Sequence, residues 1–397
     1  MGGMRITPTT LTVKRTLLVI AVQGSPSFGN MPLEHTIPRG RKARDMTDID
    51  SVNLDALLEK MVGDMGAAAV APLVILGDRL GLYKALAEHG PISTDALAVS
   101  TGTTERYVRE WCAAQAGSGY IEFDSETGDF SMSPEQQAVF ADDDSPACMT
   151  GGYYGIGSMF LDEPKVTEAF RTGEGVSWGD HSDCLFCGTE KFFRPGYEAN
   201  LVTDWLPALE GVVEKLGRGG NVADIGCGHG ASTLVMARTF PNSTFVGFDF
   251  HKPSVDCANA RAAESGLSNV SFEVAAAKDF PGDGYDLVAY FDCLHDMGDP
   301  VGGLAHTLKS LQPNGTLMLV EPFAHDDLEQ NLNPIGRMYY AFSTMICTPA
   351  SISQEVGLAL GAQAGPKRLE AVAREAGFSH FRQATATPFN MILEVRP

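Results

Sequence analysis

Residues 222–230 read VADIGCGHG, an apolar run that ends in a turn with three glycines. The run at Asn221–Ile225 predicts a central strand of a parallel sheet, because such strands are short and buried on both faces. Ala231–Phe240 predicts the helix that follows the turn. Glycines at such a turn let a ligand contact the backbone, so the sequence predicts a ligand-binding strand–turn–helix unit.

The glycines alone leave the ligand open, because Gly226, Gly228 and Ala231 also satisfy a relaxed G-x-G-x-x-G/A dinucleotide fingerprint. Asp224, two residues ahead of the first glycine, favours a different ligand. A strand that receives a pyrophosphate gains nothing from a carboxylate at its exit, whereas the sulfonium and ammonium groups of S-adenosylmethionine are stabilised there. We therefore expect S-adenosylmethionine at this turn, bound by Asp224, Gly226, Cys227, Gly228 and Gly230. A purely structural turn is the alternative.

The second strand ends in an acidic residue. Asp249 closes the predicted strand Thr244–Asp249, nineteen residues after Gly230. A carboxylate at this place accepts hydrogen bonds from both ribose hydroxyls of an adenosine moiety, and we expect Phe250 to pack on the adenine. NAD sites share this acid, so an NAD-dependent oxidoreductase is an alternative, but it leaves Asp224 unexplained.

Alternation of strands and helices continues to the C-terminus. Further strands are predicted at Val270–Val274, Tyr285–Phe291 and Thr316–Glu321, and two closing strands around Phe381–Ala384 and Phe389–Val395. This regular pattern predicts an α/β fold with a Rossmann-like, doubly wound, mostly parallel sheet.

The N-terminal part predicts a helical winged-helix domain. Helices are expected at Ile92–Ser100 and Thr104–Gly117, followed by a hairpin of Tyr120–Phe123 and Asp129–Met132. Residues 70–145 hold four basic and thirteen acidic side chains, whereas a domain that reads DNA needs a basic face. We expect a structural role and no nucleic-acid partner. A ligand-responsive transcriptional regulator is the alternative function.

A helix predicted from Asn53 onward is apolar on more than one side. Leu54, Leu57, Leu58 and Met61 share one face, and Ala67–Leu76 is almost wholly apolar. A small domain cannot easily cover such a helix, so we predict a homodimer through the N-terminal domain.

Composition excludes some classes of partner. The chain has 397 residues, with 29 basic and 50 acidic side chains and a formal net charge of −21. This charge argues against attraction to nucleic acid or to an anionic bilayer. The apolar run Leu17–Val22 is too short to span a membrane. Eight scattered cysteines favour a reducing cytoplasm, and the CxxC spacing of Cys184 and Cys187 lacks the further ligands of a zinc site, so no metal is expected.

These observations divide the chain into four parts. We expect a disordered or non-native extension at residues 1–45 and a winged-helix dimerisation domain at 46–148. A helical connector that covers the active site is expected at 149–200, and the domain that binds the cofactor at 201–397.

From about residue 200 the chain resembles class I S-adenosylmethionine-dependent methyltransferases in its glycine turn, the acid of the second strand and the strand order. With the winged helix included, it is similar to the dimeric small-molecule O-methyltransferases. That group carries a His-Asp-Trp-Ser-Asp segment after the fourth strand, and residues 291–299 read FDCLHDMGD here, with Met297 in place of the Trp. The resemblance implies that His295 is the general base and that Glu321, at the end of the fifth strand, orients it.

The resemblance also extends the cofactor site. In the family an Asp after the third strand often bonds the adenine amino group, and this sequence has Ala276 at the matching place. Adenine recognition is therefore expected from the backbone near Ala277 and Lys278, or from Asp279. Phe291, at the end of the fourth strand, completes the expected cofactor site.

Methyl transfer from a sulfonium is an in-line displacement, so the protein has to align the acceptor and remove its proton. An imidazole with a pKa of about 6.5, held by a carboxylate, suits a phenol or an acidic hydroxyl. We predict methylation of a small, apolar or aromatic hydroxylated acceptor in a pocket formed by Tyr153, Tyr154, Tyr197, Met338 and Phe342. The alternatives are a structural role for His295 and plain packing for the aromatic residues.

Overall fold

The computed structural model describes residues 49–397. The chain divides into a short unit, residues 1–57, and a large unit, residues 58–397. The extension predicted at residues 1–45 lies outside the described residues.

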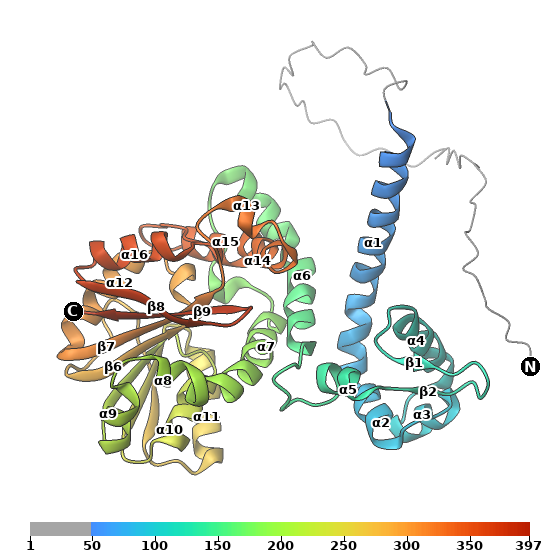
Figure 1. Ribbon diagram of the computed structural model, residues 1–397, viewed down its shortest axis with the longest axis horizontal. Coiled ribbons are helices and arrows are strands. Elements are labelled where there is room, and N and C mark those ends of the chain that lie inside the picture. The colour runs from blue at the N-terminus through green and yellow to red at the C-terminus, as the bar shows by residue number, and fades with distance from the viewer. Residues whose placement is uncertain (1–48) are drawn as a thin grey trace, which may run out of the picture. The chain divides into compact units, whose positions relative to one another are not determined.

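Short helices and a small hairpin follow the long helix α1, as Figure 1 shows. Their bounds are α1 (Ser51–Arg79), α2 (Leu82–His89), α3 (Thr94–Thr101), α4 (Glu105–Gly117), β1 (Glu122–Phe123), β2 (Phe130–Ser131) and α5 (Pro134–Phe140). The hydroxyl of Ser93 caps α3 by accepting a hydrogen bond from the amide of Ala96. Ser133 and Gln136 form a capping box at the start of α5. Tyr83, Trp111 and Phe140 pack together in the core of this domain.

Helix α1 has an apolar surface that little of the domain covers. It is the one helix in the described part of the chain that is long and apolar enough to cross a membrane, which by itself is weak evidence of a span. Leu58, Met61, Val62 and Met65 lie at helical spacing and are 47–70% exposed. Leu58 and Met61 belong to the apolar face that the sequence predicts for dimerisation, and Val62 and Met65 extend it.

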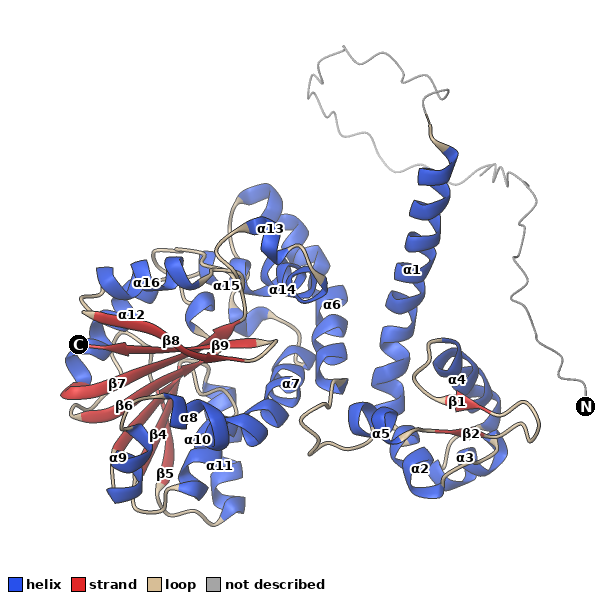
Figure 2. Cartoon of the chain, in the orientation of Figure 1, coloured by secondary structure: helices blue, strands red, loops and turns tan. Residues whose placement is uncertain are grey.

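A seven-stranded sheet forms the second half of the large unit (Figure 2). Its strands lie in the order β5-β4-β3-β6-β7-β9-β8. The bounds are β3 (Asn221–Ile225), β4 (Thr244–Asp249), β5 (Val270–Val274), β6 (Tyr285–Phe291), β7 (Leu311–Pro322), β8 (His380–Ala386) and β9 (Asn390–Arg396). The first five strands pair in parallel, and β9 pairs antiparallel with both β7 and β8. The predicted doubly wound, mostly parallel sheet is confirmed.

Alternate residues of the central strands face opposite layers of helices. Ala223 and Ile225 join a cluster that includes Leu369 of α16 (Pro366–Glu375). Val222 joins one that includes Leu216 of α9 (Val212–Arg218) and Met236 of α10 (Ala231–Thr239). This follows from the two-residue period of a strand. The helices that flank the sheet are α8 (Leu206–Ala208), α9 (Val212–Arg218), α10 (Ala231–Thr239), α11 (Lys252–Ser265), α12 (Pro300–Ser310) and α16 (Pro366–Glu375). Burial on both faces explains why most residues of β3 and β6 are apolar.

Other helices connect the parts of the fold or follow β7 (Figure 1). Before the sheet come α6 (Thr150–Thr172), the short turn η2 (Trp178–Asp180), α7 (Cys184–Asn200) and the π-helical turn η3 (Leu201–Trp205). The turn η4 (Leu294–Asp296) follows β6. After β7 come α13 (Leu328–Asn331), α14 (Pro334–Phe342), η5 (Ser343–Cys347) and α15 (Thr348–Ile352).

Candidate active site

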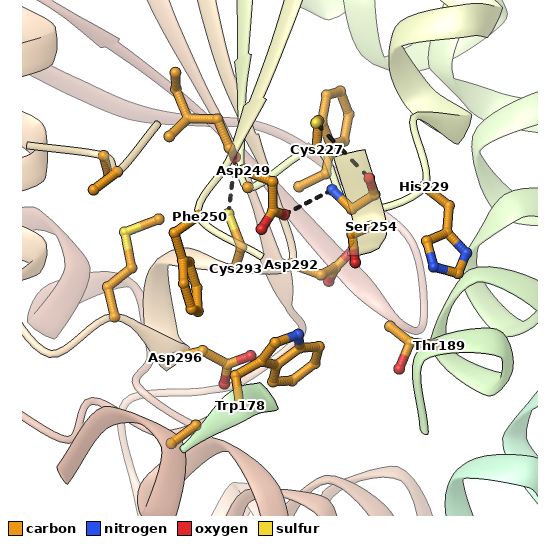
Figure 3. Close-up of a pocket in the computed structure, with 18 of the residues that line it drawn as sticks. Trp178, Thr189, Cys227, His229, Asp249, Phe250, Ser254, Asp292, Cys293 and Asp296 are labelled. Carbon is orange, nitrogen blue, oxygen red and sulfur yellow. Dashed lines mark hydrogen bonds between the residues drawn. The ribbon is translucent and has the colours of Figure 1, made fainter. Parts of the chain in front are cut away.

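The carboxyl ends of β3, β4 and β6 meet at one edge of the sheet. After β3 the chain continues to β4 and β5 on one side of β3, and it then returns to β6 on the other side. This reversal opens a crevice at the strand ends. A cavity of about 370 Å³ lies there, lined by the turn after β3, the ends of β4 and β6, and residues of α7 (Figure 3). Its volume is typical of a small-molecule site.

The glycine turn forms part of the cavity wall. Gly226 and Gly228 have left-handed backbone, with φ of +70° and +51°, and both line the cavity together with Cys227. A Cβ on Gly226 would lie 2.7 Å from Sγ of Cys293, whereas a Cβ on Gly228 would meet no atom within 4 Å. The backbone N–H of Gly228 donates a hydrogen bond to Oδ2 of Asp249 at 2.9 Å (Figure 3). This hydrogen bond connects the turn to the end of β4. The space over Gly228 stays open.

Asp249 lines the cavity although its exposed fraction is only 9%. Its Oδ1 accepts a hydrogen bond from the amide of His251 at 2.8 Å. Burial raises the pKa of Asp249, against the opposing effect of these two backbone donors. Each carboxylate oxygen keeps a lone pair for a ligand hydroxyl. The cavity also includes the other residues predicted beside the adenosine: Phe250, Ala277, Lys278 and Phe291.

Asp224 and Gly230 lie behind the cavity wall rather than in it. Asp224 is fully buried, and its Oδ2 accepts hydrogen bonds from the hydroxyls of Ser232 at 2.7 Å and Thr233 at 2.6 Å. Its Oδ1 is buried with no hydrogen-bond partner among the described residues. Burial raises the pKa of this carboxyl to about 6. The prediction that Asp224 borders the ligand is therefore corrected: its carboxylate is directed to the start of α10.

Gly230 begins α10 with φ of +78°. A Cβ there would lie 2.5 Å from the ring of Phe272, so this glycine allows the helix to pack against β5. The prediction that Gly230 contacts the cofactor is therefore replaced: this residue allows α10 to pack against β5.

Tyr197 and Asp292 form a hydrogen-bonded pair inside the cavity. The hydroxyl of Tyr197 donates to Oδ2 of Asp292 at 2.8 Å, and the side-chain amide of Asn390 donates to Oδ1 at 2.7 Å. Asp292 has a left-handed backbone, with φ of +50°, which is uncommon for a residue other than glycine. Burial raises its pKa to about 8. Of the five residues predicted for the acceptor pocket, Tyr197 is the one that lines the cavity.

His295 and Glu321 are paired, as the sequence predicts. Nδ1 of His295 lies 2.6 Å from Oε2 of Glu321, and both side chains are buried. Nε2 of His295 faces Asp296, whose Oδ1 is 3.2 Å away. Burial opposes the charged imidazolium, but Asp296 and Glu321 outweigh that effect and hold the pKa of His295 well above its usual range. Asp296, not His295, is the member of this group that lines the cavity.

Tyr153 and Tyr154 do not line the cavity, which corrects their assignment to the acceptor pocket. The hydroxyl of Tyr153 lies 2.9 Å from that of Tyr120, and its ring packs on the winged-helix core. The hydroxyl of Tyr154 donates to Oδ2 of Asp78 at 2.7 Å. Both residues are on α6, and their polar ends are satisfied by the N-terminal domain.

Met338 and Phe342 are also misassigned. Met338 packs on a small cluster around Tyr339 and Cys347. Phe342 approaches α6 so closely that a Cβ on Gly155 would lie 2.9 Å from its ring. The helical spacing of these side chains in α14 marks a packing stripe, the alternative that the sequence left open.

Several residues that line the cavity were not predicted. Trp178, Phe186, Thr189, Glu190 and Phe193 come from η2 and α7, and His229, Asp292, Asp296 and Met297 come from the turns after β3 and β6. The aromatic run FFRPGY at residues 192–197 is the one signal in the sequence for this wall. Trp178, Phe186, Thr189 and Glu190 carry no motif, because they reach the cavity only when η2 and α7 pack beside the sheet edge. The other four lie within the quoted stretches 222–230 and 291–299.

Comparison with protein families finds two matches in different parts of the chain. Residues 216–377 match a model described as a methyltransferase domain. Residues 68–141 match one described as an Rv2258c-like winged HTH domain.

Curated relatives match over short segments. A tRNA (guanine-N(7)-)-methyltransferase of Shewanella halifaxensis is 41% identical over 68 residues, 17% of this chain and 29% of that protein. An uncharacterized methyltransferase, YcgJ, of Bacillus subtilis is 28% identical over 121 residues, 30% of this chain and 47% of that protein. The chain thus spans less than half the length of each.

Solved structures match over most of the chain. The mitomycin 7-O-methyltransferase MmcR aligns with a TM-score of 0.63 and 18% identity, covering 88% of this chain and 100% of that one. Human N-acetylserotonin methyltransferase, solved in complex with S-adenosylmethionine, aligns with a TM-score of 0.64 and 16% identity, covering 88% and 99%. At these low sequence identities, the structural likeness establishes the fold alone. That fold includes the helical domain that precedes the sheet.

The described residues fit the cofactor of such a domain. Open space lies over the backbone of Gly228, and Asp249 keeps free lone pairs. Six acidic side chains line the cavity: Glu190, Asp249, Asp292, Asp296, Asp299 and Glu355. An acidic lining suits a sulfonium ligand. Together with the matched domain, these features indicate S-adenosylmethionine as the cofactor. Residues 216–377 thus form a methyltransferase domain, in the fold of the class I S-adenosylmethionine-dependent methyltransferases, and this domain follows an N-terminal winged helix-turn-helix domain.

Proposed function

We propose that this methyltransferase transfers the methyl group of S-adenosylmethionine to a hydroxyl group of a small, apolar or aromatic molecule. The observation that carries the proposal is one cavity that joins the glycine turn and Asp249 to the aromatic side chains of Trp178, Phe193 and Tyr197. Flat apolar walls of this kind suit a ring-shaped acceptor held beside the methyl donor. A cavity of about 370 Å³ favours a small molecule over a folded RNA or protein.

Proton removal from the acceptor is assigned to the group around His295. Asp296 lines the cavity and lies 3.2 Å from Nε2 of His295, whose Nδ1 is held by Glu321. The electrophile is already activated in the cofactor, so alignment and proton removal are the remaining tasks of the protein.

The winged-helix domain is proposed as a dimerisation domain. Its exposed stripe of Leu58, Met61, Val62 and Met65 suits a second copy of the same helix. The transcriptional-regulator alternative is not favoured. In the second helix of the winged motif, both exposed arginines are paired with acids of the same helix, Arg106 with Glu110 and Arg109 with Glu105.

A calorimetric titration with S-adenosylhomocysteine tests the cofactor site. We expect micromolar binding to the wild-type chain and a loss of at least tenfold in Asp249→Ala, because that variant removes the acceptors for the ribose hydroxyls. NADH and a DNA duplex serve as controls that are expected not to bind. Binding of NADH or the duplex in place of S-adenosylhomocysteine would contradict the proposal.

The role of His295 is tested by turnover on a panel of small phenols. His295→Ala is expected to lower turnover by about 10²–10⁴ while the affinity for S-adenosylhomocysteine changes little, because the residue lies outside the cofactor cavity. Product formation is followed by mass spectrometry of the methylated phenol. Unchanged turnover in this variant would remove His295 from the proposed mechanism.

A further inference from the structure

Two of the acidic side chains that line the cavity lack a basic partner. The other four are paired: Glu190 with Arg261 at 2.8 Å, Asp299 and Glu355 with Lys278 at 3.4 Å and 2.7 Å, and Asp296 with Nε2 of His295 at 3.2 Å. Asp249 and Asp292 accept hydrogen bonds from neutral donors alone among the described residues. A cationic ligand therefore meets these two carboxyl groups without competition from a basic side chain.

The two acids stand at the ends of strands on opposite sides of β3 (Figure 3). Asp249 ends β4, and Asp292 directly follows β6. Ile225 pairs with Phe248 of β4 and with Tyr290 of β6, so both acids lie just beyond the same level of the sheet. Neighbouring strands are about 4.8 Å apart, so the ends of β4 and β6 are about 10 Å apart, with the glycine turn between them.

This arrangement determines which acid the sulfur of the cofactor approaches. The adenine is expected beside Phe250, Ala277 and Lys278, which follow β4 and β5, and the ribose is expected at Asp249. The sulfur is attached to the 5′ carbon of that ribose. The rest of the cofactor then extends over the glycine turn, away from β5 and toward the end of β6, which brings the sulfonium group to Asp292.

The carboxyl group of Asp292 is held in place from two sides. The hydroxyl of Tyr197 donates to Oδ2 at 2.8 Å, and the amide of Asn390 donates to Oδ1 at 2.7 Å. The backbone of Asp292, with φ of +50°, is in a conformation that costs free energy outside glycine and recurs at functional sites. Sγ of the next residue, Cys293, donates to the carbonyl oxygen of Ile225 at 3.1 Å. The carboxyl group thus has a fixed position beside the glycine turn before a ligand binds.

We propose that Asp292 recognises the sulfonium charge of S-adenosylmethionine, so that the protein binds the methyl donor in preference to the product S-adenosylhomocysteine. A carboxylate attracts a sulfonium strongly at a buried site, because the effective dielectric constant there is low. The product carries a neutral thioether and leaves an ionised Asp292 buried without a cation, which is costly. Methyl transfer therefore weakens the hold on the cofactor and favours exchange of product for donor.

Titration of Asp292 couples this preference to pH. Polar or titratable side chains of several neighbouring elements face it: Tyr197 of α7, His295 of η4, Glu321 of β7, Tyr339 of α14 and Asn390 of β9. Burial and the carboxylate of Glu321 raise the pKa of Asp292 to about 8, against the imidazolium and the two hydrogen-bond donors. Near pH 7 the carboxyl group of the cofactor-free protein is thus protonated. Binding of a sulfonium releases this proton, whereas binding of a thioether does not.

Calorimetric titrations of the full-length chain at pH 6.5 and pH 8.5 test the assignment. The ratio of dissociation constants, S-adenosylhomocysteine over S-adenosylmethionine, is compared between wild type and Asp292→Asn, because the ionisation of the free ligands is the same in both experiments. From the lower to the higher pH, the ratio is expected to rise at least tenfold more in wild type than in the variant. The same pH dependence in both proteins would overturn the proposal.

A matched control separates Asp292 from the overall charge of the cavity. Glu355→Gln also removes one negative charge, but from an exposed acid that Lys278 already neutralises. This variant is expected to keep the ratio within about twofold of wild type. A loss of preference as large as that in Asp292→Asn would assign the effect to net charge and would contradict a specific role of Asp292.

Two further measurements remain informative if Asp292→Asn folds poorly. Tyr197→Phe removes a donor that lowers the pKa of Asp292, so the pH at which the ratio changes is expected to move upward. In wild type, binding enthalpies at pH 7 in phosphate and in Tris give the protons released, and S-adenosylmethionine is expected to release about one more proton than S-adenosylhomocysteine. Equal proton release by the two ligands would contradict the proposal. None of these titrations needs an acceptor, so their outcome is independent of the proposed function.

Discussion

Asp224 is a fully buried carboxylate with two hydroxyl donors and one unpartnered oxygen. Its pKa is raised from 3.8 to about 6, so its ionised form destabilises the folded state. The stability that the carboxyl contributes is fully present below about pH 4, where it is protonated in both states, and is lost as the pH rises through about 6. We therefore predict that Asp224→Asn raises the free energy of unfolding by about 1–3 kcal/mol at pH 7.5. Thermal unfolding of the cofactor-free protein at several pH values measures this.

The gain in unfolding free energy from Asp224→Asn is expected to disappear near pH 4. An equal gain at pH 4 and at pH 7.5 would contradict the linkage argument.

The Asp224→Asn variant also tests the electrostatic role that the sequence suggests for this carboxylate. Removing a negative charge is expected to weaken binding of S-adenosylmethionine, which carries the sulfonium, about tenfold more than binding of the neutral thioether S-adenosylhomocysteine. Equal losses for the two ligands would show that Asp224 acts only on the fold of the turn.

The turn between β3 and α10 combines two glycines with different tasks. Gly230→Ala places a methyl group 2.5 Å from the ring of Phe272 and forces a side chain into left-handed backbone. We predict a loss of about 2–4 kcal/mol in unfolding free energy, the sum of strain and overpacking. Gly228→Ala meets no atom within 4 Å, so its loss is expected to be about 1 kcal/mol from the backbone alone. Chemical denaturation of both variants gives these values.

The two glycine variants are expected to rank in the opposite order for cofactor affinity. Gly228→Ala, which loses less stability, should lose more affinity. Gly228 lines the cavity and Gly230 does not, so Gly228→Ala should reduce affinity for S-adenosylhomocysteine by at least tenfold at a temperature where both variants are folded. If Gly230→Ala instead weakens binding more than Gly228→Ala, the division of tasks within the turn is wrong.

At the scale of the whole molecule, the exposed stripe of α1 is an apolar surface that the described residues leave without cover. Leu58, Met61, Val62 and Met65 are 52%, 47%, 70% and 66% exposed. We predict that the wild-type chain sediments as a dimer at micromolar concentration and that Met61→Glu/Met65→Glu shifts it to the monomer, because two charges then face an apolar partner. Lys60→Ala, on the same helix, is the control and should stay dimeric. A monomeric wild-type chain would contradict the proposal.

The sequence by itself determined the local units of this protein. The alternation of short apolar runs and helices predicted the strands of the parallel sheet, and the bounds of β3, β4, β5 and β6 agree with those predictions. Glycine spacing and the acid at the end of β4 predicted residues that line the cavity, because these residues belong to one short stretch of chain. The pairing of His295 with Glu321 was reached by resemblance and is confirmed by their 2.6 Å contact.

Tertiary structure alone decided which side chains share a cavity. Helical spacing cannot distinguish a stripe that packs on a neighbouring helix, such as Met338 and Phe342, from one that lines a pocket. A carboxylate at a strand end can point to either side of the turn, and in Asp224 the hydroxyls of Ser232 and Thr233 decide the direction. Cys347 meets His295 and Asp296 only because two connections that leave neighbouring strands β6 and β7 converge over one sheet edge. Contacts between residues far apart in sequence depend on how whole elements pack, and no local pattern records that.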